Sequence, residues 1–141
     1  MARDSKPPVT VPDGNPPLDL VIDDLEVGTG AEAAAGSRVT VHYVGVSWST
    51  RAEFDSSWDR GDPFGFPLGD GRVIVGWDRG IVGMRVGGRR RLIIPPHLAY
   101  GDAGAGLFIK ANETLVFIVD LLAVEPDGAT RPPRRGLFRR S

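Results

Sequence analysis

Apolar and polar residues alternate along the middle of the chain, as they do in half-buried β-strands. Residues 38–44 alternate in this way and are rich in β-branched and aromatic side chains, which favour a pleated sheet. A second strand is predicted over residues 91–94, where Pro95 ends it. The longest apolar run, residues 114–124, predicts a third strand with Asp120 on its polar face. The apolar face of that strand carries Leu115, Phe117, Val119 and Leu121.

One stretch of the chain has helical spacing instead. Four apolar residues recur there at i, i+3, i+7 and i+10, which predicts a short helix with one buried stripe. Gly80 and Gly83 lower the helix propensity, so we expect burial to hold this helix in place. The predicted fold class is therefore α+β, with one bent antiparallel sheet wrapped against one short α-helix. The buried stripe consists of Ile74, Trp77, Ile81 and Met84.

The two ends of the chain differ in composition from its middle. Residues 1–17 contain five prolines and no apolar periodicity, and residues 126–141 are rich in arginine and proline. Both are predicted to be disordered segments. They flank one folded domain, residues 18–125, within a chain of 141 residues that is long enough to bury a core.

The overall composition is that of an ordinary globular protein, with 41% hydrophobic and 25% charged residues. The net charge of −1 gives no global attraction to nucleic acid or to an anionic membrane. The chain has no cysteine, which excludes disulfides and thiolate chemistry. Neither a signal peptide nor a membrane-spanning run is evident. We therefore predict cytoplasmic residence and no membrane partner.

Few side chains in the sequence are suited to covalent catalysis. Four short segments instead bring aromatic and aliphatic residues together around one carboxylate, Asp55, and one phenol, Tyr100. Such an apolar hollow suits chemistry that breaks no covalent bond. His42 and His97 are too few and too isolated for a metal cage or a catalytic triad, so no metal and no cofactor is predicted. The four segments are Phe54-Asp55-Ser56-Ser57, Val73-Ile74-Val75-Gly76-Trp77, Ala99-Tyr100-Gly101 and Thr114-Leu115-Val116-Phe117.

These segments, with four more in compatible order and spacing, make the chain similar to FKBP-type peptidyl-prolyl cis-trans isomerases, the tacrolimus- and rapamycin-binding immunophilins. The resemblance covers roughly residues 18–125. It implies a half-barrel of five or six antiparallel strands curled around a short helix, with the prolyl pocket between them. The four further motifs are Val41-His42-Tyr43-Val44-Gly45, Pro63-Phe64, Leu68-Gly69 and Ile94-Pro95.

The resemblance also implies an aromatic pocket for the proline ring. Trp77 would form its floor, and Val73 and Ile74 would line one side, with the backbone N–H of Ile74 offered to the substrate. Phe54 would close the edge. The walls would be Tyr43, Phe64 and Phe117.

The same resemblance assigns the polar groups of the pocket. Tyr100 would donate its hydroxyl to a substrate carbonyl. Asp55, positioned by Tyr43 and Arg60, would polarise the region of the substrate carbonyl or orient the ligand.

Residues 101–113 correspond to a flap over the pocket, to which Phe108 and Ile109 would contribute. The flap departs from the family pattern. Ala105 stands in place of a frequent histidine, and residues 107–111 replace a proline-rich tip. Catalysis is therefore a firmer expectation than any particular substrate preference or macrolide affinity.

The chemistry also follows from the residues without the family. Rotation about an X–Pro bond must overcome amide resonance, a barrier of about 18–20 kcal/mol. The twisted amide is less charge-separated than the planar one, so a dry apolar pocket penalises the planar ground state more. A thousandfold acceleration needs only about 4 kcal/mol, and no nucleophile is required.

Other interpretations remain open at this stage. Taken singly, Trp77 could be the buried side of a helix, Asp55 a turn or cap residue, and Tyr100 ordinary strand-end packing. The whole chain could be a prolyl-peptide or macrolide binding module, or a chaperone module, whose isomerase rate is incidental. The arginines of residues 131–140 could contact nucleic acid, but as an accessory at most. The leading hypothesis is a monomeric isomerase that acts on proline-containing polypeptides.

Overall fold

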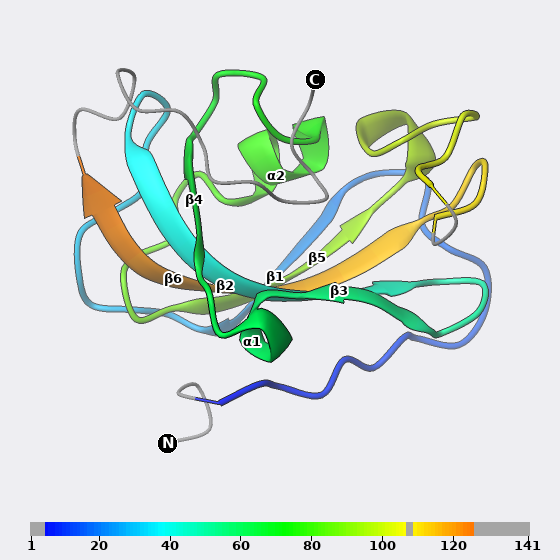
Figure 1. Ribbon diagram of the computed structural model, residues 1–141, viewed down its shortest axis with the longest axis horizontal. Helices are drawn as coiled ribbons and strands as arrows, with labels where there is room; N and C mark the ends of the chain where they lie inside the picture. Colours follow the sequence, from blue (N-terminus) through cyan, green and yellow to red (C-terminus); the bar gives the residue numbers. More distant parts are fainter. Residues whose placement is uncertain (1–4, 107–108, 126–141) are drawn as a thin grey trace.

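The computed structural model, which describes residues 5–106 and 109–125, contains one six-stranded antiparallel sheet and two short α-helices (Figure 1). The strands run in the order β1-β5-β6-β2-β3, and β4 also pairs with β2. None of the described helices is long and apolar enough to cross a membrane. The elements are β1 (Val21–Glu26), β2 (Arg38–Ser47), β3 (Glu53–Ser56), α1 (Ser57–Arg60), β4 (Phe64–Pro67), α2 (Val75–Gly80), β5 (Arg89–Ile94), the 3-10 turn η2 (Pro96–Leu98) and β6 (Leu115–Glu125).

Strand β2 organises the sheet because it has partners on both sides. It pairs with β6 along its whole length, with a register shift between Thr40 and Val41. Its other edge is shared, since β4 pairs with its first half and β3 with its second half. The sheet curves around α2, which lies on its concave side, whereas α1 lies on the opposite side (Figure 1). The predicted α+β half-barrel is confirmed, with the sheet left open.

The main core fills the concave side of the sheet. The inward-facing residues of β2 and β6 pack there against α2, and Trp77 at the centre is fully buried. The predicted apolar stripe is confirmed, because all four of its residues lie in this core. The helix itself is shorter than the stripe, since Gly83 adopts a φ of +93° that no helix contains. Met84 therefore reaches the core from the loop after α2.

Glycines let α2 approach β5 closely. A Cβ atom on Gly76 would lie 2.4 Å from Cγ2 of Ile94, and one on Gly80 would lie 2.8 Å from Cδ2 of Leu92. Side chains at these two positions would push the helix away from the strand. The low helix propensity of this segment is thus compensated by close packing, and that packing sets the depth of Trp77 in the core.

A second apolar cluster lies on the outer side of the sheet. It consists of Val46, Trp48, Ile93 and Val116, covered by Val11 from the N-terminal segment. Residues 5–13 have no regular secondary structure and run along this outer side (Figure 1). The extended conformation agrees with their prolines.

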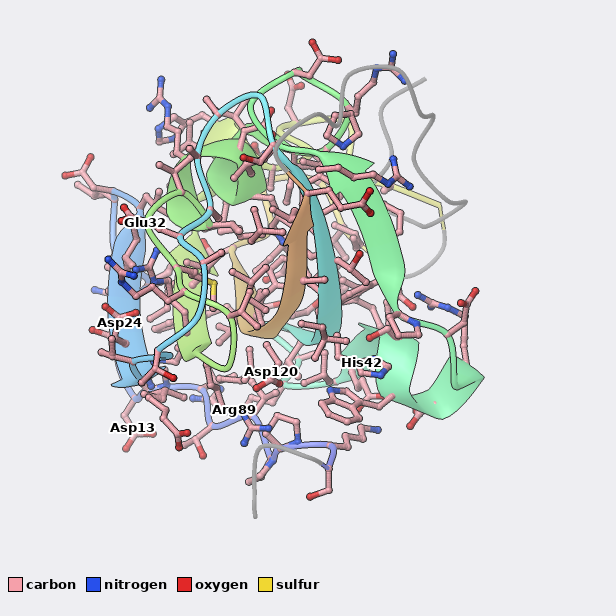
Figure 2. All side chains as sticks on the ribbon, turned by 90° about the vertical axis from the view of Figure 1, so that its left-hand side faces the viewer. Asp13, Asp24, Glu32, His42, Arg89 and Asp120 are labelled. Carbon is pink, nitrogen blue, oxygen red and sulfur yellow. The ribbon has the colours of Figure 1, made fainter. Side chains whose placement is uncertain are left out.

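The three consecutive arginines of β5 resemble a solvated strand end in the sequence, but the structure does not place them at one. β5 is an internal strand between β1 and β6, so both of its edges are paired and its arginines lie between side chains of the neighbouring strands. Arg89 and Arg90 are less than 10% exposed. Figure 2 shows Arg89 beside Asp120, in the same outer row of the sheet as His42. The ion pairs are Arg89–Asp120 at 2.6 Å, Arg90–Asp24 at 2.7 Å and Arg91–Asp23 at 2.7 Å.

Candidate active site

Four aromatic rings from four different elements meet on the concave side of the sheet. Tyr43 of β2 lies with its ring centroid 4.9 Å from that of Trp77 in α2, at an interplanar angle of 77°. Phe117 of β6 is 5.4 Å from Trp77, and Phe64 of β4 is 6.0 Å from it. All these ring pairs are edge-to-face, the geometry in which one ring's positive edge meets the other's negative face. The structure therefore brings the predicted floor and walls into one cluster.

A polar network adjoins this cluster. The Tyr43 hydroxyl donates to Oδ2 of Asp55 at 2.5 Å and accepts from Nη2 of Arg60 at 2.8 Å. Arg60 also donates through Nη1 to Oδ1 of Asp55, which accepts a second bond from the backbone N–H of Ser56 at 2.8 Å. The Asp55 side chain is only 9% exposed. Its two oxygens are thus satisfied, and the carboxylate is fixed in one orientation.

The helical turn α1 is what returns Arg60 to Asp55. Ser56 caps the turn, since its hydroxyl accepts from the backbone N–H of Asp59 at 3.3 Å. Gly61 ends the turn in the left-handed conformation, with φ of +65°. This second helix was not predicted, because four residues give no helical period. The guanidinium of Arg60 also lies over the Tyr43 ring, 5.6 Å from its centroid.

Burial keeps the phenols of the site neutral. It raises the pKa of Tyr43 well above its usual value, and the hydrogen bond to Asp55 raises it further. Burial likewise raises the pKa of Tyr100, and the charge of Asp55 adds to this effect. Burial alone would lower the pKa of Arg60, but its hydrogen bond to Tyr43 and the charge of Asp55 outweigh burial and raise it. The site therefore holds two protonated phenols and one permanent cation.

The remaining predicted residues occupy the same region, with one exception. Val73 and Ile74 are buried in the main core, and Tyr100 packs against it. The Phe54 ring stands edge-on to Phe117 at 5.6 Å. Phe108 lies outside the described residues. The functional roles assigned to these residues stay predictions.

The described part of the flap, residues 101–106 and 109–113, is folded back on itself. Ala105 and Ile109 exchange two backbone hydrogen bonds of 2.9 and 3.1 Å, and Ile109 is buried in the main core. At the base of the flap, the buried carboxylate of Glu113 accepts bonds from the backbone and hydroxyl of Ser49. The flap is thereby anchored to the loop between β2 and β3.

One aromatic residue of the site was missed in the sequence. Phe66 is fully buried, stacks on Phe64 with centroids 5.3 Å apart, and lies 5.6 Å from Trp77. The signal was present, because Phe64 and Phe66 are two residues apart and therefore on one face of a strand. Among the described residues, no three His, Asp or Glu side chains are grouped so that they could hold a metal ion.

An open antiparallel sheet and one helix bring a cluster of aromatic rings beside a fixed carboxylate, which defines an α+β domain with an apolar candidate site. Comparison with known proteins agrees with this class. A family profile described as "FKBP-type peptidyl-prolyl cis-trans isomerase" matches residues 30–122. The chain belongs to this family, whose members are generally peptidyl-prolyl isomerases.

Relatives with similar sequences extend over most of the chain. An "FK506-binding protein" of Streptomyces anulatus is 60% identical over 120 residues, which cover 84% of this chain and 97% of the relative. A "Probable FK506-binding protein" of Corynebacterium glutamicum is 55% identical over 118 residues, covering 84% and 98%.

Two solved structures have the same fold. The crystal structure of AtFKBP13 is 42% identical with a TM-score of 0.69, and the match covers 74% of this chain and 91% of that one. FkpA from Escherichia coli is 43% identical with a TM-score of 0.69, and the match covers 76% of this chain but 48% of FkpA.

Proposed function

We propose that this protein catalyses cis-trans isomerisation of X–Pro bonds in polypeptides and so assists protein folding. The observation that carries this proposal is that an aromatic cluster and a fixed carboxylate lie side by side. Edge-to-face aromatic rings of Tyr43, Trp77 and Phe117 form an apolar wall, and the Asp55 carboxylate is held at its rim by three donors. Uncatalysed isomerisation takes tens to hundreds of seconds, so such a site has a slow reaction to accelerate.

The proposed mechanism separates the two features. The aromatic wall takes up the proline ring and removes water from the imide, which favours the twisted transition state over the more polar planar amide. The Tyr100 hydroxyl, held protonated by burial, donates to a substrate carbonyl. Asp55 acts as a fixed negative group that orients the peptide. No proton is transferred and no covalent bond is formed.

Macrolide binding belongs to the proposal as well. The names of the relatives state that they bind FK506, and the wall residues Tyr43, Trp77 and Phe117 are in place here. We propose that tacrolimus and rapamycin occupy the same wall and compete with peptide. Cytoplasmic residence and a monomeric state remain proposals that rest on the sequence.

A protease-coupled assay on a short X–Pro peptide tests the proposal. We expect the rate of the slow cis-to-trans phase to rise in proportion to enzyme concentration. Rapamycin should abolish this acceleration. A chain that binds rapamycin but leaves the slow phase unchanged would instead be a binding module. Activity that resists rapamycin would contradict the shared site.

A further inference from the structure

The N-terminal segment runs along the outer side of the sheet and contacts β3 and α1, the two elements that carry Asp55 and Arg60. We call residues 5–13 the strap. The carbonyl of Ser5 accepts a bond from Nη2 of Arg89 at 3.1 Å, and Val11, 9% exposed, covers the outer cluster. Near the other end, Nη2 of Arg51 donates to the carbonyl of Pro12 at 3.4 Å. In Figure 2 the labelled Arg89 side chain lies on the side of the sheet where the strap runs.

Lys6 of the strap joins the two ends of one short segment. Its Nζ lies 2.9 Å from Oε1 of Glu53 in β3 and 3.0 Å from both carboxylate oxygens of Asp59 in α1. Between these partners lies Asp55, and directly after Asp59 comes Arg60. The ammonium group of Lys6 therefore links β3 to α1 on the outer side of the sheet, opposite the aromatic wall.

Removal of this ammonium would leave two like charges facing each other. Glu53 and Asp59 both lie within 3.0 Å of Nζ, so without Lys6 their carboxylates would repel across a short gap. Apart from Lys6 and Glu53, Asp59 is influenced by the charge of Arg60, which is engaged with Asp55 and Tyr43. The repulsion would act on α1 and would therefore shift Arg60 relative to Asp55.

We propose that Lys6 is a positioning residue for the isomerase site: it fixes the Asp55–Arg60 pair from the outer side by bridging Glu53 and Asp59. This inference rests on the proposed isomerase function. Exposed ion pairs contribute little to folding stability, and the side chain of Lys6 is 36% exposed. The effect should accordingly appear in catalysis, where small displacements of an orienting group matter, more than in the melting temperature.

The test uses variants of the full chain in the coupled assay. Lys6→Ala is expected to lower kcat/KM about two- to fivefold with little change in melting temperature, and Lys6→Arg should retain most of the activity. Glu53→Gln in the Lys6→Ala background removes the repulsion and should restore kcat/KM. Added salt should also raise the rate of Lys6→Ala by screening the two carboxylates.

Arg51→Ala is the matched control. It removes one cation that binds the other end of the strap, through the carbonyl of Pro12 and the carboxylate of Asp13. Its kcat/KM should equal that of the wild type. Equal losses in Lys6→Ala and Arg51→Ala would indicate simple strap docking and overturn the proposal, as would failure of Glu53→Gln to restore Lys6→Ala.

A second readout separates this inference from the isomerase assignment. In ¹H–¹⁵N spectra, Lys6→Ala should shift the amides of residues 54–61 and leave those of β6 unchanged. If the wild type shows no isomerase activity, the proposed function fails, and the amide shifts alone decide whether Lys6 holds this segment. Unchanged amides at residues 54–61 would overturn the inference whatever the activity.

Discussion

Replacing Tyr43 with phenylalanine tests whether the polar network at the rim serves catalysis. Tyr43→Phe keeps the buried ring and its edge-to-face contacts but removes the hydroxyl that bonds Asp55 and Arg60. Oδ1 of Asp55 keeps its bonds to Arg60 and Ser56, whereas Oδ2 loses its donor. A buried acceptor that loses its donor costs about 1–3 kcal/mol, and the two donors that remain on Oδ1 continue to stabilise the charge of the carboxylate. The phenyl ring offsets part of this, so we expect about 1–2 kcal/mol lower unfolding free energy.

That loss corresponds to a melting temperature lower by about 5–10 °C for a domain of this size. Because Asp55 is then held through only one of its two oxygens, kcat/KM in the coupled assay should fall by about tenfold, equivalent to about 1.4 kcal/mol of transition-state stabilisation. Val116→Ala is the control: Val116 is fully buried in the outer cluster, so its loss lowers stability comparably without touching the pocket. Undiminished kcat/KM of Tyr43→Phe, measured well below its melting temperature, would refute the orienting role of the network.

Three further predictions follow from the same geometry. Phe66→Leu should lower both the unfolding free energy and kcat/KM, because the Phe66 ring packs against Trp77 and Phe64. A urea titration measures the first effect and the coupled assay the second. Unchanged kcat/KM would exclude Phe66 from the site. Arg90→Ala should lower the unfolding free energy by about 2–4 kcal/mol, because Nη1 of Arg90 donates to the carbonyls of Gly80 and Val82 at the end of α2. A urea titration measures this loss, and a value below about 0.5 kcal/mol would contradict the anchoring of α2 by Arg90. Folding raises the pKa of Tyr43 above its usual value of 10.0. The contribution of the Tyr43 hydroxyl to stability should therefore be complete below pH 10 and lost as pH rises further. By contrast, kcat/KM should stay flat between about pH 6 and 9. Alkaline melting curves and a pH–rate profile would check these two statements, and a bell-shaped profile in that range would contradict the second.

The local parts of the fold were readable from the sequence. Alternation over residues 38–44 and the apolar run of residues 114–124 predicted the two long strands, β2 and β6, because each has one face in the core. The apolar stripe through Trp77 predicted α2 and its buried face. These patterns depend only on the period of one element, so they need no knowledge of its partners.

Contacts between residues distant in the sequence were not readable. The arginines of β5 look like a solvated run, and only the sheet order reveals that Asp23, Asp24 and Asp120 neutralise them. Lys6 stands in a proline-rich lead-in, 53 residues before its partner Asp59. Charge pairs leave no periodic signal along the chain. For the same reason the site residues, including Tyr43 and Arg60 as the partners of Asp55, were predicted by resemblance to a family and by no pattern along the chain.

A solvent deuterium isotope effect tests the central claim most directly. If the imide turns in a dry aromatic site without acid or base catalysis, kcat/KM in the coupled assay should be nearly the same in H₂O and D₂O, with a ratio of about 1. A ratio of about 2 or more would show that a proton moves in the rate-limiting step, and the proposed mechanism would be wrong.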